Sequence, residues 1–416
     1  MFALAVLISG LAARAPGSVL KPIERNAVAD KVAGKSLALG IDFDEANPDA
    51  PRPDPAEVQA QSAAAPGAWF LAQIQTPDDR LGEPSAELRE WFESHSQPLA
   101  AIVAILEKDA PEWKTTGDEL AQRPSLPFLA IIRLERVLLA LALYAERRGD
   151  SAGAGSALEA SWSLGKTGAA RQTLLDQLIS VAIGKFQAGA LRKMSDPPLQ
   201  WLSRLTGDDR WKGMLHAIAG EFRVAGESGL SDSSDVWAEI SRNLPQSLAD
   251  ALGKRSPCEA SLLTEEQVAQ IVERDFSMAS SEEAREIRKI GLSIVLPNTL
   301  NAAQRAARLS VDRELTLKIL ELRLERAASP EKHWPDKLSL EVSSVCPEAT
   351  YAYRRDGPTM ELRFEGSVEA PNSGPVLPLV FSSGPASTGP GPTPTPTPAS
   401  PPPLTPPAPG GMIAPQ

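Results

Sequence analysis

The chain is poor in the side chains that most often build metal sites and nucleophilic active sites. Its 416 residues include 3 histidines and 2 cysteines, and no His-Glu-x-x-His or Gly-x-Ser-x-Gly motif occurs. His95, His216 and His333 lie far apart in the sequence, and neither cysteine has the close cysteine or histidine neighbours of a zinc site. We therefore predict no metal ion and no cofactor.

Aromatic residues are also few, at 5% of the chain, whereas hydrophobic residues as a whole make up 42%. The core must therefore be built mainly from Ala, Leu, Ile and Val, a composition that favours close-packed helices over a β-sandwich. We predict a mainly α fold, an irregular stack of helical hairpins that ends in a small C-terminal β-hairpin.

Clustered basic residues and long apolar runs are missing as well. The formal net charge is −11, and because nucleic-acid binding depends on clustered Lys and Arg, we predict no nucleic-acid partner. Residues 137–145 form an apolar run within a predicted helix, well below the length of a membrane span. Membrane contact is expected only through the N-terminal segment.

The N-terminal segment has the apolar character of an export signal. Residues 2–13 have the length of a signal-peptide core, and Ala13-Arg14-Ala15 offers a small-x-small cleavage site. No Lys or Arg precedes the apolar run. We predict that residues 1–15 are a signal peptide or an N-terminal anchor, and that the protein is exported to the periplasm or the cell envelope. A plain buried helix is the alternative.

The rest of the chain divides into a helical domain with shorter segments on either side. Residues 16–84 are predicted to form an entry segment with an acidic, Ala/Pro-rich loop, and residues 85–328 carry recurrent helical periodicity. Residues 126–148 and 154–164 flank Gly149-Asp150 and resemble one tetratricopeptide-type hairpin. No second copy follows at a 34-residue period, so a repeat array is not predicted.

The last predicted helix, residues 299–328, is apolar on two sides in a helical projection. One side carries Leu317, Leu320, Leu324 and Ala327, and the nearly opposite side carries Leu315, Ile319 and Leu322. A narrow polar strip lies between them, made of Glu314, Lys318, Glu321 and Glu325. A helix with two apolar sides is buried between neighbours, so we expect this helix to be central to its domain.

Beyond that helix the periodicity changes from helical to β. Residues 329–370 are predicted to form a small β-hairpin cap, with strands at 351–355 and 359–364 and Asp356-Gly357 near the turn. Residues 371–416 are rich in proline and contain no charged residue, which predicts a disordered tail. A solvated spacer and a docking or cell-wall-spanning tail are both open roles for it.

Two pairs of residues remain as candidates for a stabilising or functional role. Cys258 and Cys346 can pair in an oxidising compartment, where closing such a long loop would stabilise the fold by about 4–5 kcal/mol; two independent thiols are the alternative. Glu221 and His216 share a predicted helix but lie about 140° apart around it, so they do not pair directly. For His216, a core or interface histidine is favoured over a catalytic base.

Motifs spread along the chain resemble an uncharacterised family of exported helical bacterial proteins. They are Pro22-Ile23-Glu24-Arg25-Asn26-Ala27, Leu134-x-x-x-Leu138-x-x-x-Ala142, Gly149-Asp150, Leu164-Gly165, Trp334-Pro335-x-x-Leu338 and Tyr351-x-Tyr353-x-x-Asp356-Gly357. The final helix and hairpin are also similar to the C-terminal part of pseudopilin-like proteins. The resemblance implies an exported helical protein and implies no activity.

Two functional hypotheses follow from these observations. The first is an exported or envelope-associated, non-enzymatic interaction scaffold whose grooves bind a protein or peptide. The alternative is an envelope hydrolase that uses buried carboxylates such as Glu221. Acid and base groups converging on one deep pocket would favour the hydrolase, whereas a solid core with a shallow apolar groove would favour the scaffold.

Overall fold

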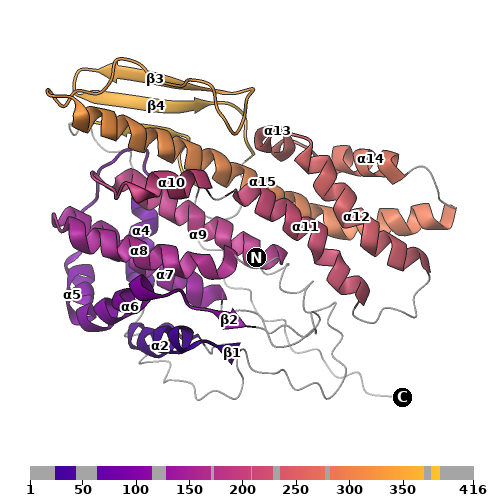
Figure 1. Ribbon diagram of the computed structural model, residues 1–416, viewed down its shortest axis with the longest axis horizontal. Coiled ribbons are helices and arrows are strands. Elements are labelled where there is room, and N and C mark those ends of the chain that lie inside the picture. Colours follow the sequence, from indigo (N-terminus) through magenta and orange to yellow (C-terminus); the bar gives the residue numbers. More distant parts are fainter. Residues whose placement is uncertain are drawn as a thin grey trace, which may run out of the picture.

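The computed structural model describes residues 24–43, 63–114, 128–169, 173–207, 209–227, 235–276, 282–369 and 376–384. The fold is mainly helical and ends in a small antiparallel sheet, as predicted (Figure 1). The predicted signal peptide or anchor, residues 1–15, lies outside the described ranges. Within those ranges, none of the helices is both long and apolar enough to cross a membrane.

The N-terminal half of the molecule is a layered group of helices. In chain order these are α2 (Ala27–Ser36), α4 (Ala64–Ile74), α5 (Ala86–Ser94), α6 (Ser96–Lys108), α7 (Phe128–Arg147), α8 (Ser151–Ala169) and α9 (Leu174–Lys193). A short 3-10 helix, Leu37–Leu39, follows α2, and the two-residue strands β1 (Glu24–Arg25) and β2 (Trp113–Lys114) pair antiparallel. In Figure 1 this group lies below α15, with α2 at the outer edge.

The pair α7 and α8 forms the predicted hairpin. Gly149 between them has a φ of 73°, a left-handed conformation that glycine adopts without steric cost. The Asp150 carboxylate accepts a hydrogen bond from Gly153 N at 2.9 Å and so stabilises the start of α8. Both helices pack against α9, while α4 packs on α7 and α6 packs on α8.

The predicted domain boundary at residue 85 does not separate two structural units. Val32 of α2 and Phe70 of α4 belong to the same hydrophobic cluster as the buried residues of α7, α8 and α9. The Phe70 ring meets the Phe186 ring edge to face, with 5.9 Å between centroids. The entry segment therefore contributes to the core, although most of its acidic loop, residues 44–62, lies outside the described ranges.

The C-terminal half is organised around one long helix. Its elements are α10 (Gln200–Gly207), α11 (Arg210–Glu227), α12 (Asp235–Gly253), α13 (Pro257–Ser261), α14 (Glu265–Phe276) and α15 (Glu282–Ala328). Helix α15 packs against α9 and against each of the helices α10 to α14, and it runs across the width of Figure 1. The expectation of a central last helix is therefore confirmed.

Helix α15 begins at Glu282 rather than at the predicted residue 299, and Pro297 lies inside it. An internal proline costs roughly 3 kcal/mol in a helix. Here Leu296 and Leu300 on either side of it are buried in one cluster with α11, α12 and α14. Burying two leucines is worth about as much as the proline costs, so the helix continues through it.

The predicted apolar sides of α15 differ in burial. Leu315, Ile319 and Leu322 are fully covered, whereas Leu324 is 37% exposed. The polar strip is split as well, because its first two members, Glu314 and Lys318, are buried. Helix α15 is thus enclosed on both sides only in its middle, and its last turns meet solvent.

The C-terminal sheet has three strands rather than the predicted two. Strands β3 (Thr350–Asp356) and β4 (Thr359–Glu365) form the expected hairpin, in which Asp356 pairs with Thr359. Strand β5 (Val380–Ser383) then pairs antiparallel with β4. It comes from the segment predicted as a disordered tail, and that prediction is wrong for residues 376–384. The sheet packs on α15 through the cluster that contains Phe381, whereas Leu377, just before β5, is buried in the cluster of the N-terminal helices.

Candidate functional site

Three hydrophobic clusters meet along α15. The first contains residues of α2 and of the helices α4 to α10. The second joins α11, α12 and α14 to the first half of α15, and the third lies between α15 and the sheet. Leu205, Trp211 and Val345 belong, respectively, to these three clusters or pack against them. All three residues line one cavity, which therefore lies at the junction of the clusters.

This cavity, named here the α15 cavity, has a volume of ≈ 410 Å³. Its lining is Leu205, Thr206, Asp209, Arg210, Trp211, Pro257, Ser310, Arg313, Glu314, Leu317, Ser344 and Val345. The α15 members are spaced three and four residues apart, so they share one face of the helix and form the floor. The walls come from the end of α10, the start of α11, the start of α13 and the loop before β3.

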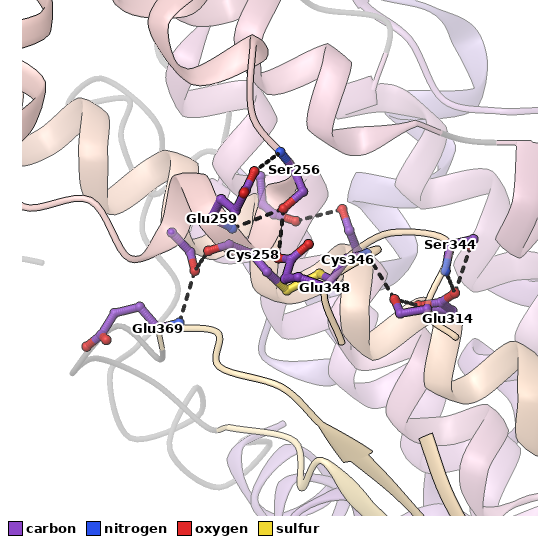
Figure 2. The surroundings of a disulfide bond; sticks show 12 residues. Ser256, Cys258, Glu259, Glu314, Ser344, Cys346, Glu348 and Glu369 are labelled. Carbon is purple, nitrogen blue, oxygen red and sulfur yellow. Dashed lines mark hydrogen bonds between the residues drawn. A yellow bond between two sulfur atoms is a disulfide. The ribbon is translucent and has the colours of Figure 1, made fainter. Parts of the chain in front are cut away.

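A disulfide joins two walls of the cavity. Cys258 of α13 and Cys346 of the loop before β3 are bonded, with 5.6 Å between their Cα atoms, and both are buried (Figure 2). Their chain neighbours Pro257 and Val345 line the cavity. The bond therefore fixes the spacing of the α13 wall and the loop wall.

The carboxylate of Glu314 holds the same loop from the floor side. One of its oxygens accepts hydrogen bonds from Ser344 N at 2.6 Å and Ser344 Oγ at 2.7 Å (Figure 2). The other accepts from Ser343 Oγ at 2.5 Å and from the Tyr351 hydroxyl at 3.0 Å. Burial, together with the adjacent Glu314 charge, raises the pKa of Tyr351. Four donors thus satisfy this buried charge, as burial requires.

Two arginines complete the floor and a wall. Arg313 of α15 donates through Nη2 to the carbonyl oxygens of Arg204 and Leu205, at 2.5 and 3.0 Å, where α10 ends. Arg210 is the first residue of α11, and both Arg210 and Arg313 are 7% exposed. Carbonyl groups at a helix C-terminus lack partners within the helix, so Arg313 stabilises the end of α10.

Other buried charges connect helices at a distance from the cavity. Glu135 of α7 accepts hydrogen bonds from Ser161 of α8 and Gln187 of α9. Burial raises the pKa of Glu135 to about 8, despite these two donors. Arg192 of α9 donates to the carbonyl oxygen and the carboxylate of Asp312 on α15, at 2.7 and 3.3 Å.

The residues singled out in the sequence do not converge. His216 is exposed on α11 and does not line the α15 cavity. Glu221 lies on the same helix, but its side chain is outside the described part of the structure. His95 stacks on Trp91, with 4.4 Å between ring centroids, and His333 pairs with Glu331 at an exposed position.

A group with metal-ligand composition does occur among the described residues. Cys258, Cys346 and Glu348 have ligand atoms within 4.8 Å of one another. Both sulfurs are in the disulfide, however, and a cysteine binds zinc only as a free thiolate. The group therefore offers Glu348 alone as a charged ligand, and Glu348 already accepts a hydrogen bond from Ser256 Oγ at 2.8 Å.

Sequence reasoning missed the α15 cavity, although one signal for it was present. Ser310, Arg313, Glu314 and Leu317 follow helical spacing, which places mixed polar and apolar residues on one face. The chain matches no protein-family model, no curated protein and no solved structure. The function must therefore be inferred from this site.

Proposed function

We propose that this protein is an exported or envelope-associated interaction protein that docks a peptide segment of a partner in the α15 cavity. The observation that carries the proposal is the composition of the cavity lining. Leu205, Leu317 and Val345 are half-buried there, so an apolar side chain from a partner would extend the apolar contact that they begin. A volume of ≈ 410 Å³ suits one or two side chains of a peptide.

Export is supported by the disulfide. Cytosolic thiols are kept reduced, whereas buried structural disulfides persist in oxidising compartments. The bond between Cys258 and Cys346 is buried and joins elements that are 88 positions apart in sequence. This agrees with the apolar N-terminal segment, whose role as a signal peptide or anchor stays a prediction.

The hydrolase alternative gains no comparable support. A general acid or base needs room for substrate beside it, and a nucleophile within hydrogen-bond reach. Among the described side chains, the buried carboxylates of Glu135, Asp312 and Glu314 accept hydrogen bonds from other parts of the protein. Those of Glu135 and Asp312 connect helices, and those of Glu314 order a loop. The described lining of the α15 cavity includes no histidine. A docking role therefore accounts for the site better than hydrolysis does.

A pair of matched variants tests the docking site. A phage-displayed library of random heptapeptides is selected on the wild-type protein, and the affinities of enriched peptides are measured by isothermal titration calorimetry. Leu317→Asp introduces a charge into the cavity lining, whereas Leu324→Asp makes the same change on an exposed face of α15. We expect Leu317→Asp to weaken binding at least about tenfold and Leu324→Asp to leave it unchanged.

Circular dichroism and urea unfolding establish first that both variants are folded. Peptides that bind the two variants with equal affinity would place the docking site elsewhere on the protein. A selection that enriches no peptide above an empty support would also contradict the proposal.

A further inference from the structure

The disulfide and Glu348 form a compact group of side chains beside helix α13. The ligand atoms of Cys258, Cys346 and Glu348 lie within 4.8 Å of one another. The disulfide occupies both sulfurs, but a newly made chain carries them as thiols, and a chain in a reducing compartment keeps them so. The sequence alone predicted no metal site, because 88 positions separate the two cysteines. The reduced chain therefore brings two thiols and a carboxylate to one place.

Contacts other than the disulfide hold Cys258 in position. It belongs to α13, whose first turn is closed by a capping box in which Ser256 Oγ accepts from Glu259 N and the Glu259 carboxylate accepts from Ser256 N, both at 3.1 Å. Gln304 of α15 donates to the carbonyl oxygen of Ser261, at the end of α13, at 3.2 Å. These contacts involve no sulfur atom, so they keep α13 on α15 when the disulfide is absent.

Cys346 is held in place in the same way. Its N–H donates to Ser343 Oγ at 2.9 Å, and Ser343 Oγ in turn donates to Glu314 of α15. Ser256 Oγ donates to Glu348 Oε1 at 2.8 Å, which ties the loop before β3 to the start of α13 (Figure 2). The two sulfurs should therefore stay close together after reduction.

Two thiolates and a carboxylate are a ligand set that Zn²⁺ accepts. Bond lengths of about 2.3 Å to sulfur and about 2.1 Å to oxygen place the ligand atoms of a tetrahedral zinc ion about 3.5–3.8 Å apart. Glu348 is exposed, so a change of rotamer can bring its oxygen to that distance. The same exposed position gives the ion a route to the two buried sulfurs.

We propose that the reduced chain binds one Zn²⁺ ion through the thiolates of Cys258 and Cys346 and the carboxylate of Glu348, with water as the fourth ligand. A dithiol reductant supplies the two electrons and two protons that convert the disulfide to two thiols, and it is itself oxidised to a disulfide. Zinc then displaces both thiol protons. The ion joins the same two segments as the disulfide, so zinc binding and disulfide formation exclude each other. This inference does not depend on peptide docking.

Cobalt spectroscopy tests the site in the wild-type protein. The full chain is reduced with dithiothreitol, freed of it by gel filtration under nitrogen, and titrated with Co²⁺ and then with Zn²⁺; a sample that keeps its disulfide is the control. We expect the reduced chain to develop a thiolate-to-cobalt charge-transfer band that saturates at one equivalent and that Zn²⁺ abolishes. The disulfide sample should show no such band. Since the chain has only 2 cysteines, the band reports on Cys258 and Cys346.

Matched variants assign the carboxylate ligand. Glu348→Gln removes the charge from the group, whereas Glu341→Gln removes a charge from an exposed position of the same loop outside the group. Competition with a chromophoric zinc chelator measures the affinity of each reduced protein for Zn²⁺. We expect Glu348→Gln to weaken zinc binding at least about tenfold and Glu341→Gln to leave it unchanged.

Three results would overturn the proposal. The first is a reduced chain that has two titratable thiols and the circular dichroism of the native protein but gives no thiolate-to-cobalt band. The second is a reduced chain that unfolds and is not refolded by Zn²⁺, because the contacts of α13 and the loop would then fail to hold the sulfurs together. The third is an equal zinc affinity of Glu348→Gln and the wild type, which would exclude the carboxylate from the ligand set.

Discussion

Glu135 lies in an environment very different from that of a surface carboxylate. It is completely buried where α7, α8 and α9 meet, and one of its oxygens lacks a hydrogen-bond partner among the described residues. Ser161 and Gln187 bond the other oxygen. A charged carboxylate is costly in such a place, which is why burial raises the pKa of Glu135 to about 8.

The raised pKa of Glu135 predicts a stability that falls as pH rises. In the unfolded chain Glu135 loses its proton near the ordinary glutamate pKa of 4.5, whereas the folded protein keeps it up to about pH 8. Between these values the folded state binds more protons, so its free energy of unfolding decreases by up to roughly 1.4 kcal/mol per pH unit. The loss is complete above about pH 8.

Glu135→Gln should abolish this part of the pH dependence. The amide is neutral at every pH, so the variant should be less sensitive than the wild type between pH 5 and 8 and more stable than it at pH 8.5. Urea unfolding of both proteins across this range measures the difference, and Glu325→Gln at an exposed position of α15 is the control. A difference in unfolding free energy that stays constant with pH would contradict the assignment.

At the scale of elements, the disulfide is the covalent link between helix α13 and the loop before β3. Cys258 and Cys346 close a loop of 88 residues, which in the chain-entropy model stabilises the fold by about 4–5 kcal/mol. The double variant Cys258→Ala/Cys346→Ala should therefore lose about 2–5 kcal/mol of unfolding free energy in urea. Wild-type protein in excess dithiothreitol should match the variant, and equal stability of all three samples would contradict a structural role.

The elements that the sequence predicted are those with local signals. The apolar periodicity of residues 126–164 around Gly149-Asp150 predicts two helices, and the structure has α7 and α8 there. Pro297 gave a misleading local signal, because the burial of Leu296 and Leu300 is decided by helices distant in sequence. Propensity is a weak guide wherever tertiary packing opposes it.

The same limit explains why β5 and the α15 cavity were missed. Strand β5 has four residues in a proline-rich segment, and it exists because Val380 and its neighbours pair with β4. The cavity lining comes from five separate segments, from Leu205 to Val345. Only the α15 face of the cavity is recognisable as a pattern in the sequence. The residues that form the walls could not be predicted without knowing the fold.

At the scale of the whole molecule, residues 376–384 connect parts that are far apart in sequence. The carbonyl oxygen of Pro378 accepts from Arg192 of α9 at 2.8 Å, and that of Leu377 accepts from Arg308 of α15 at 2.6 Å. Ser382 N donates to the carbonyl oxygen of Pro77 at 2.8 Å. One short segment thus joins α9, α15 and the chain that follows α4.

Two truncations that differ by these residues should therefore differ sharply in stability. A chain ending at residue 384 retains every contact just described, so we expect its unfolding free energy to equal that of the full chain. A chain ending at residue 375 loses the burial of Leu377 and Phe381, worth about 1.5–3 kcal/mol each. It also removes the Pro378 carbonyl oxygen that Arg192 bonds and the Leu377 carbonyl oxygen that Arg308 bonds, so a loss of about 5 kcal/mol or failure to fold is expected.

Phe381→Ala in the full chain tests the same contact without shortening the protein. Phe381 is 1% exposed between the sheet and α15, and its ring lies 5.3 Å from the guanidinium carbon of Arg323. Removing the ring leaves a cavity, which should cost about 3–5 kcal/mol in urea unfolding. Equal stability of the chains ending at 375 and 384, or a cost below about 1 kcal/mol for Phe381→Ala, would show that β5 is dispensable. The expected losses would instead place the C-terminal limit of the folded body beyond β5 rather than at residue 370.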